Sequence, residues 1–283
     1  MIRKSLIIIC SVLLISTINA QDTETKTGDD ILKQVIDKVA TIKSATYQLD
    51  KIERVKGKEI SEKLKIKLLL EPFKVYSFMV EPKEGMEVLY DSEWEKKKAI
   101  INTNSFPWVN VKFGPTSKTM RKDQHHTILD SGYGKIVSNI QYDKQKKAGK
   151  TISTLIGTET VEGNSCYILE IVDNEFSYKT YLVGEGEDLS IIANKLKVSD
   201  YMILEANRKV KFYDDVEAGQ QIKVPSSYSK RMLMYVDVNE LIPLKIEVYD
   251  DKGLFEQFLF KNVKLNVNFK ENEFSEDFEE YDF

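Results

Sequence analysis

The sequence is poor in cysteine, histidine and proline. Its 283 residues include two cysteines, two histidines and six prolines. Cys10 lies inside an apolar run near the N-terminus, which leaves Cys166 as the single cysteine of the remaining chain. One thiol cannot form an internal disulfide, so the fold has to be stabilised by its core. Cys166 lies in the strand-like stretch CYILEIV and is expected to be a small buried hydrophobe.

Sequence signatures of catalysis are also missing. There is no Gly-x-Ser-x-Gly elbow, glycine-rich phosphate loop or His-Glu-x-x-His run. Neighbouring acids such as Glu279 and Glu280 do not supply the two carboxylates that a glycosidase holds across a cleft. We therefore expect a protein that is not an enzyme and that has no catalytic residue and no cofactor.

The two histidines, His125 and His126, are adjacent. In an extended segment their side chains would point to opposite faces, and neither a third histidine nor a cysteine lies at ligand spacing, so no metal site is expected. A general-base or pH-sensing role stays open, as does a plain hydrogen bond to a backbone carbonyl.

Positive charge is not in excess, because the net charge is −4 at pH 7. Nucleic-acid binding needs a basic face, so a nucleic-acid partner is excluded. Beyond the first 20 residues no apolar run reaches the roughly 20 residues of a transmembrane helix. Within those 20 residues, Arg3 and Lys4 precede an apolar run, and Ala20 precedes the polar stretch QDTETKTGDD. Residues 1–20 are predicted to be a signal peptide cleaved near Ala20, with the mature chain starting near Gln21 in the periplasm.

Most of the remaining sequence alternates like β-sheet. A predicted amphipathic helix at 31–42 comes first, and its apolar side includes Val35. About ten short strands follow, joined by connections too short for crossover helices, which predicts an antiparallel sheet. They are expected near residues 47–55, 64–70, 73–80, 86–91, 97–103, 108–113, 151–157, 166–172, 231–238, 244–250, 255–260 and 263–269. One apolar face of this sheet needs a cover, for which there is one obvious helix.

The stretch 181–225 interrupts this pattern with two short helices. Apolar residues recur at helical spacing from Leu189 and again from Met202, and Asp188 and Ser199 are plausible N-caps. Short strands flank the pair, which gives the order β-α-α-β. Residues 181–225 resemble the LysM module in the following positions: Tyr181, Val183, Gly186, Glu187, Leu189, Ser190, Ile192, Ala193, Asn207, Gly219, Gln220, Ile222, Val224 and Pro225.

This resemblance implies a partner and a site. The partner would be peptidoglycan or another glycan containing N-acetylglucosamine. The sugar-binding residues would lie in the loop after the first strand and the loop after the second helix, namely Gly186, Glu187, Asp188, Leu189, Asn207, Arg208 and Lys209. The usual Asp is Glu187 here, and the usual Thr is Asp188.

The rest of the chain resembles the outer-membrane lipoprotein carrier superfamily. The closing run Ile242-Pro243-Leu244 with Phe260-Lys261-Asn262-Val263 carries this likeness, and residues 72–76, 85–90 and 123–127 resemble an uncharacterised bacterial family within it. The implied fold is α+β: a half-open antiparallel β-barrel with an N-terminal helix. The LysM module would be inserted between residues 21–180 and 226–283. A lipid cavity would be lined by Val35, Leu64, Ile66, Leu68, Trp94 and Trp108.

The expected function is non-enzymatic binding in the cell envelope, with glycan on the module and a lipid or lipoprotein in the half-barrel. Two rival hypotheses are a scaffold without ligand and an envelope hydrolase. The tail, residues 271–283, holds seven acids interleaved with aromatics. It is expected to be solvated and frayed, with a partner-docking peptide as the alternative.

Overall fold

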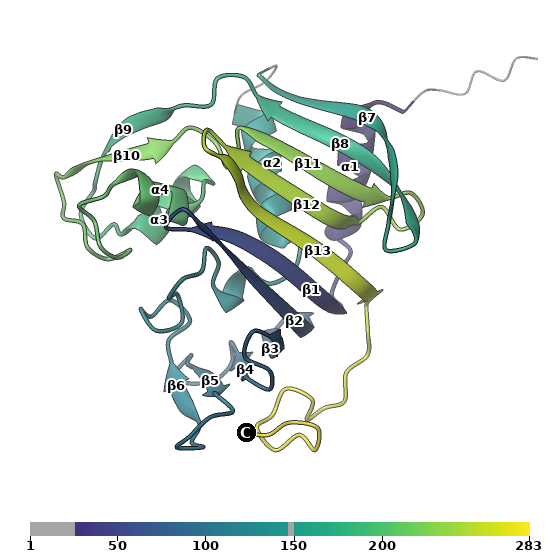
Figure 1. Ribbon diagram of the computed structural model, residues 1–283, viewed down its shortest axis with the longest axis vertical. Helices are drawn as coiled ribbons and strands as arrows, with labels where there is room; N and C mark the ends of the chain where they lie inside the picture. The colour runs from purple at the N-terminus through teal and green to yellow at the C-terminus, as the bar shows by residue number, and fades with distance from the viewer. Residues whose placement is uncertain (1–25, 147–149) are drawn as a thin grey trace, which may run out of the picture.

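The computed structural model describes residues 26–146 and 150–283, and within them most of the chain forms one curved antiparallel sheet (Figure 1). Its eleven strands in the described part of the chain lie in the order β6-β5-β4-β3-β2-β1-β13-β12-β11-β8-β7. β6 and β7 are the two edges, so the barrel is open. The predicted signal peptide and the expected start at Gln21 lie outside the described residues.

The strands of the large sheet are β1 Ser44–Val55, β2 Lys58–Leu70, β3 Phe73–Glu81, β4 Glu87–Asp91, β5 Ala99–Asn102, β6 Val111–Phe113, β7 Thr151–Val161, β8 Asn164–Asp173, β11 Arg231–Asp237, β12 Pro243–Asp250 and β13 Gly253–Leu265. A separate two-stranded sheet consists of β9 Tyr178–Leu182 and β10 Gln221–Pro225. The helices are α1 Gly28–Val39, η1 Ile128–Asp130, α2 Gly134–Lys146, α3 Leu189–Leu196 and α4 Asp200–Ala206. The described residues include no helix with the length and apolarity needed to cross a bilayer.

The predicted β-rich α+β fold is confirmed, with one change among the strands. The strands expected at 255–260 and 263–269 are one strand, β13, which ends at Leu265 and pairs with both β1 and β12. The hairpin of β1 and β2 turns at Lys56 and Gly57, both with positive φ, as the tight turn between twisted strands requires.

Two helices, rather than one, lie behind the sheet (Figure 1). α1 begins at a capping box in which Thr27 and Asp30 bond each other's backbone N–H, and it contacts β7 and β8 through the buried side that holds Val35. α2 was not predicted, and it contacts α1 and β7. The expectation of a single covering helix is therefore wrong.

Residues 178–225 form a small β-α-α-β unit between two neighbouring strands of the large sheet. β8 pairs antiparallel with β11, with Val172 opposite Arg231. β9 pairs with β10, and the Ser226 N–H donates to the Ser177 carbonyl over 2.8 Å, so the unit leaves and returns to the sheet at one point. Such an insertion leaves the pairing of the parent strands intact.

The acidic tail folds back onto the sheet, so the expectation of a frayed end is wrong. The Tyr281 ring stacks on Tyr76 of β3 at 3.7 Å between centroids. The Asp282 N–H donates to the Glu87 carboxylate over 3.0 Å, and Phe278 is 3% exposed. Lys67 lies 4.8 Å from the Phe278 ring centroid and 2.9 Å from Glu273. The aromatic residues supply buried apolar area, and β2 supplies positive charge to the interleaved acids.

We predict that Phe278→Ala lowers the free energy of unfolding by about 3 kcal/mol, because it removes a buried aromatic ring and leaves a cavity. Phe106→Ala is the matched control, since Phe106 is 85% exposed. Its effect should stay within about 0.5 kcal/mol. Urea denaturation measures both, and equal stability of the two variants would show that the tail does not dock.

Candidate ligand-binding sites

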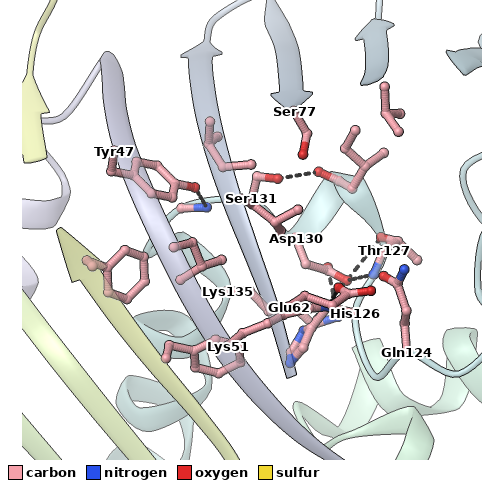
Figure 2. Close-up of a pocket in the computed structure, with 18 of the residues that line it drawn as sticks. Tyr47, Lys51, Glu62, Ser77, Gln124, His126, Thr127, Asp130, Ser131 and Lys135 are labelled. Atoms are coloured by element: carbon pink, nitrogen blue, oxygen red, sulfur yellow. Dashed lines mark hydrogen bonds and ion pairs between the residues drawn. The ribbon is translucent and has the colours of Figure 1, made fainter. Parts of the chain in front are cut away.

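A cavity of about 150 Å³ lies between the sheet and the segment 120–136 (Figure 2). Its apolar wall comes mainly from the sheet and includes Leu49, Leu64, Ile66, Met79, Met86, Val88, Ile246, Phe258 and Phe260. The facing segment, called here the cover segment, adds Met120, Gln124, His126, Thr127, Ile128, Asp130, Ser131, Gly132, Lys135 and Ile136. Lys51, Glu62 and Ser77 bring further polar groups from the strands, so the cavity is apolar on one side and polar on the other.

The cavity is small. Pockets that bind drug-sized ligands usually measure about 300–1,000 Å³. A volume of about 150 Å³ therefore accommodates a short stretch of hydrocarbon or one small ring, and a complete lipid would have to extend outside it.

The structure places two of the six predicted cavity residues, Leu64 and Ile66, in the wall of this cavity. Leu68 is 1% exposed and lies next to Gly132 beside the cavity, whereas Val35 lies on the buried side of α1, which contacts β7 and β8. Trp94 borders a separate depression of about 810 Å³ next to the tail, and Trp108 is 68% exposed. Sequence periodicity did not reveal the cover segment, because it lacks a regular period.

The cover segment is held by turns and by contacts to β1. Asp123 has a φ of 56° and Gly132 a φ of 88°, both left-handed values that bend the chain. Figure 2 shows Tyr47 of β1 beside this segment, where its hydroxyl accepts the Gly132 N–H over 3.0 Å. A side chain at residue 132 would meet Leu68 at 2.8 Å, so glycine also permits the close approach.

His125 and His126 both reach the same carboxylate, which corrects the expectation that they point apart. His125 Nδ1 and His126 Nε2 each lie 3.0 Å from Glu256 Oε2 on β13. The segment is bent rather than extended, so the alternation of side chains along a strand does not apply. Burial disfavours the charged form of Glu256, but His126 and His125 outweigh it and the pKa of this carboxyl is lowered. Glu256 is also the acceptor of the Tyr228 hydroxyl.

The predicted sugar-binding residues of the first loop have defined structural contacts. Gly186 is exposed with a φ of 71°. The Glu187 carboxylate accepts from the Gly184 N–H and from Lys195, each over 2.9 Å, and from the Tyr181 hydroxyl. Asp188 caps α3 by accepting the Ile191 N–H over 2.7 Å, and Leu189 is completely buried. These contacts fix the shape of the loop.

The second predicted loop is held differently. The Asn207 side chain donates to the Ile203 and Lys223 carbonyls and accepts the Lys223 N–H, while Arg208 and Lys209 are exposed. The first loop is instead bonded to a later part of the chain between α4 and β10. There the Tyr213 carbonyl accepts the Leu189 N–H over 2.9 Å. Within the described residues, no hydrogen bond or ion pair joins 186–189 to 207–209.

The small unit packs tightly on the cover segment. Arg121 donates to Asp200 over 2.7 and 3.0 Å and to Ser190 over 3.0 Å, and its guanidinium lies 3.4 Å from the centroid of the Tyr213 ring. The His125 ring stacks on Tyr201 of α4, at 4.2 Å between centroids, and on Phe255 of β13, at 4.1 Å. The cover segment therefore forms one wall of the cavity and also contacts the β-α-α-β unit.

Comparison with known protein families identifies this unit, because residues 181–225 match the LysM domain. The predicted LysM module is thus confirmed in position and type. Residues 42–181 match a family described as "Protein of unknown function (DUF1571)". No curated protein matches this chain.

Solved structures of similar fold include a putative outer membrane lipoprotein-sorting protein domain from Vibrio parahaemolyticus, which is 11% identical, with 88% of this chain and 97% of that chain covered and a TM-score of 0.35. A LolA superfamily protein from Nitrosomonas europaea is 12% identical, with 89% and 99% covered and a TM-score of 0.34. The Mycobacterium tuberculosis lipoprotein LppX is 10% identical, with 85% and 96% covered and a TM-score of 0.39. At 10–12% identity these likenesses concern the fold alone.

We predict that the pKa of Glu187 is about 2, held below its ordinary 4.5 by hydrogen bonds from Lys195, the Gly184 N–H and Tyr181. The carboxylate contacts therefore stabilise the loop above about pH 4.5 and are lost as the pH falls toward 2. Carbon-detected NMR titration of the side-chain carboxyl measures this value. Lys195→Met should raise it, whereas Lys179→Met, on exposed β9, should leave it unchanged; an ordinary pKa in the wild type would contradict the geometry.

Proposed function

We propose that this chain is an exported envelope protein that binds peptidoglycan-type glycan through its LysM domain and a short apolar group in the cavity of its sheet. The observation that carries this proposal is the contact between the two parts. One segment, 120–136, lines the cavity and seats the LysM domain through Arg121 and His125. A ligand in the cavity would therefore be held at a fixed position relative to the cell wall.

The glycan part rests on the match of the complete module. The exposed surface beside the Gly186–Leu189 loop supports it, because Ile191 at the start of α3 is 47% exposed. Carbohydrate rings present apolar faces, and an exposed aliphatic side chain beside open backbone groups suits them. Arg208 and Lys209 are exposed in the second loop and remain the proposed polar contacts there.

The apolar part rests on the lining of the cavity. Each buried methylene contributes about 0.8 kcal/mol, so a chain end with about four methylenes inside would gain roughly 3 kcal/mol. The other side of the cavity is polar and includes Lys51, Lys135 and Ser131, so a polar end of the same ligand would lie against this side. The end of an acyl chain, of a free lipid or of a lipoprotein, fits this pattern.

The hydrolase alternative finds little support in the carboxylates. A glycosidase needs two acidic groups whose pKa values are pushed apart, so that one stays protonated. Glu53 and Glu256 lie close together, but both pKa values are lowered despite burial, by Lys51 and the histidines for Glu53 and by the histidines for Glu256. Neither would hold a proton to donate at neutral pH.

For the glycan, we expect Ile191→Asp to reduce retention on insoluble peptidoglycan by about tenfold, because the substitution replaces apolar contact area with a charge that binding would desolvate. Ile152→Asp on β7 is the matched control, since Ile152 is 48% exposed and lies in the sheet. Sedimentation with peptidoglycan measures both. If wild type and both variants remain in the supernatant, the LysM domain does not bind this glycan.

For the cavity, we expect Val88→Phe to weaken binding of a fluorescent fatty acid by about tenfold, because the larger ring fills space that the ligand needs. Val263→Phe serves as control, since Val263 is half-buried on β13 and does not line the cavity. Fluorescence titration gives the affinities. Saturable binding that Val88→Phe leaves unchanged would place the ligand elsewhere, and an absence of binding by the wild type would leave the scaffold hypothesis.

A further inference from the structure

We propose that Glu53, His125 and Glu256 form a binding site for one divalent transition-metal ion of the zinc type. Each residue offers one ligand atom, and these atoms all lie within 4.8 Å of one another. They come from β1, the cover segment and β13, so three separate parts of the chain converge here. All three side chains are buried, with exposures of 1%, 2% and 0%.

Both ring nitrogens of His125 face hydrogen-bond acceptors, although a neutral imidazole carries only one proton. Nε2 lies 3.0 Å from the Arg54 carbonyl, which can only accept, so Nε2 carries a proton. In the neutral ring Nδ1 then has a lone pair, and it faces Glu256 Oε2 at 3.0 Å. Two lone pairs at this separation repel each other unless a proton or a metal ion lies between them.

Glu53 offers an oxygen without a partner. Its Oε2 accepts from the Lys51 ammonium over 3.2 Å and from the backbone N–H of His125 over 3.3 Å. Its Oε1 is buried and has no hydrogen-bond partner, although a buried carboxylate oxygen is costly to leave unsatisfied. A metal ion bound to this group would satisfy it.

The local charge also calls for a cation. Lys51 is shared between Glu53 and Glu62, at 3.2 and 3.0 Å, so one positive charge faces two carboxylates. Glu256 adds a third negative charge, and its Tyr228 contact is neutral. With both histidines neutral, Lys51 and these three carboxylates carry a net charge of −2, which a divalent ion would balance. Protonation of the two histidines is the competing way to balance this charge.

The donor set indicates the class of ion. One imidazole and two carboxylates suit zinc and neighbouring divalent metals, which accept nitrogen and oxygen ligands together. The Nε2–H bond from His125 to a backbone carbonyl is the usual support for a metal-bound imidazole, and His126 would position Glu256 from its other side. Such an ion would tie the cover segment to β1 and β13 beside the cavity.

The test is a zinc titration of the chelator-treated mature chain, residues 21–283, by equilibrium dialysis. We expect one zinc per chain in the wild type, and a loss of affinity of at least about tenfold in Glu53→Gln and in Glu256→Gln. Glu62→Gln is the matched control: it removes a carboxylate from the same Lys51 without removing a ligand. An equal loss in all three variants, or no stoichiometric zinc in the wild type, would overturn the proposal.

A second measurement covers the case in which a variant does not fold. NMR of nitrogen-15-labelled histidine on the wild type reports the proton on each ring nitrogen. When one equivalent of zinc is added, the Nδ1 signal of His125 should shift from its zinc-free position while Nε2 keeps its proton, and an unchanged Nδ1 signal would overturn the proposal. A His125 ring with protons on both nitrogens under these conditions would mean that protonated histidines balance the charge, and the metal site would be rejected.

Discussion

The contact of Arg121 with Asp200 holds the two parts of this protein together. The Arg121 side chain is almost completely buried, yet its charge is met by both oxygens of Asp200, by Ser190 and by the carbonyl of His125. Removing one partner of such a pair leaves an uncompensated buried charge and typically costs about 3–5 kcal/mol. The cover segment is therefore fixed against the LysM domain, and the wall of the cavity is fixed with it.

The cavity exists because the sheet is open and its apolar face is covered by separate elements. An open antiparallel sheet needs separate elements to cover its apolar face. Here α1 and α2 cover the region of β7 and β8, and the cover segment closes over β1 to β4 and β13. A space of about 150 Å³ remains beneath the cover segment.

The sequence predicted features that depend on neighbouring residues and missed those that depend on distant ones. The β-α-α-β order of residues 181–225 and most strands could be read from caps, turns and periods, such as Asp188 before α3, and the resemblance to the LysM motif identified the module. The docked tail could not, because Tyr281 finds Tyr76 more than 200 positions away. The histidine cluster could not be predicted either, since Glu256 lies in a strand whose pattern says nothing about His125. From the sequence alone, acidic and histidine residues are expected at the surface, because their buried partners are distant in the chain.

We propose that one molecule binds glycan and an apolar ligand at the same time. In a co-sedimentation experiment, a fluorescent fatty acid is mixed with the protein and insoluble peptidoglycan, and the fluorescence of the pellet is measured. We expect fluorescence to enter the pellet in proportion to the protein and to stay in solution when the protein is omitted. Protein that sediments while the fatty acid remains in solution would contradict this proposal.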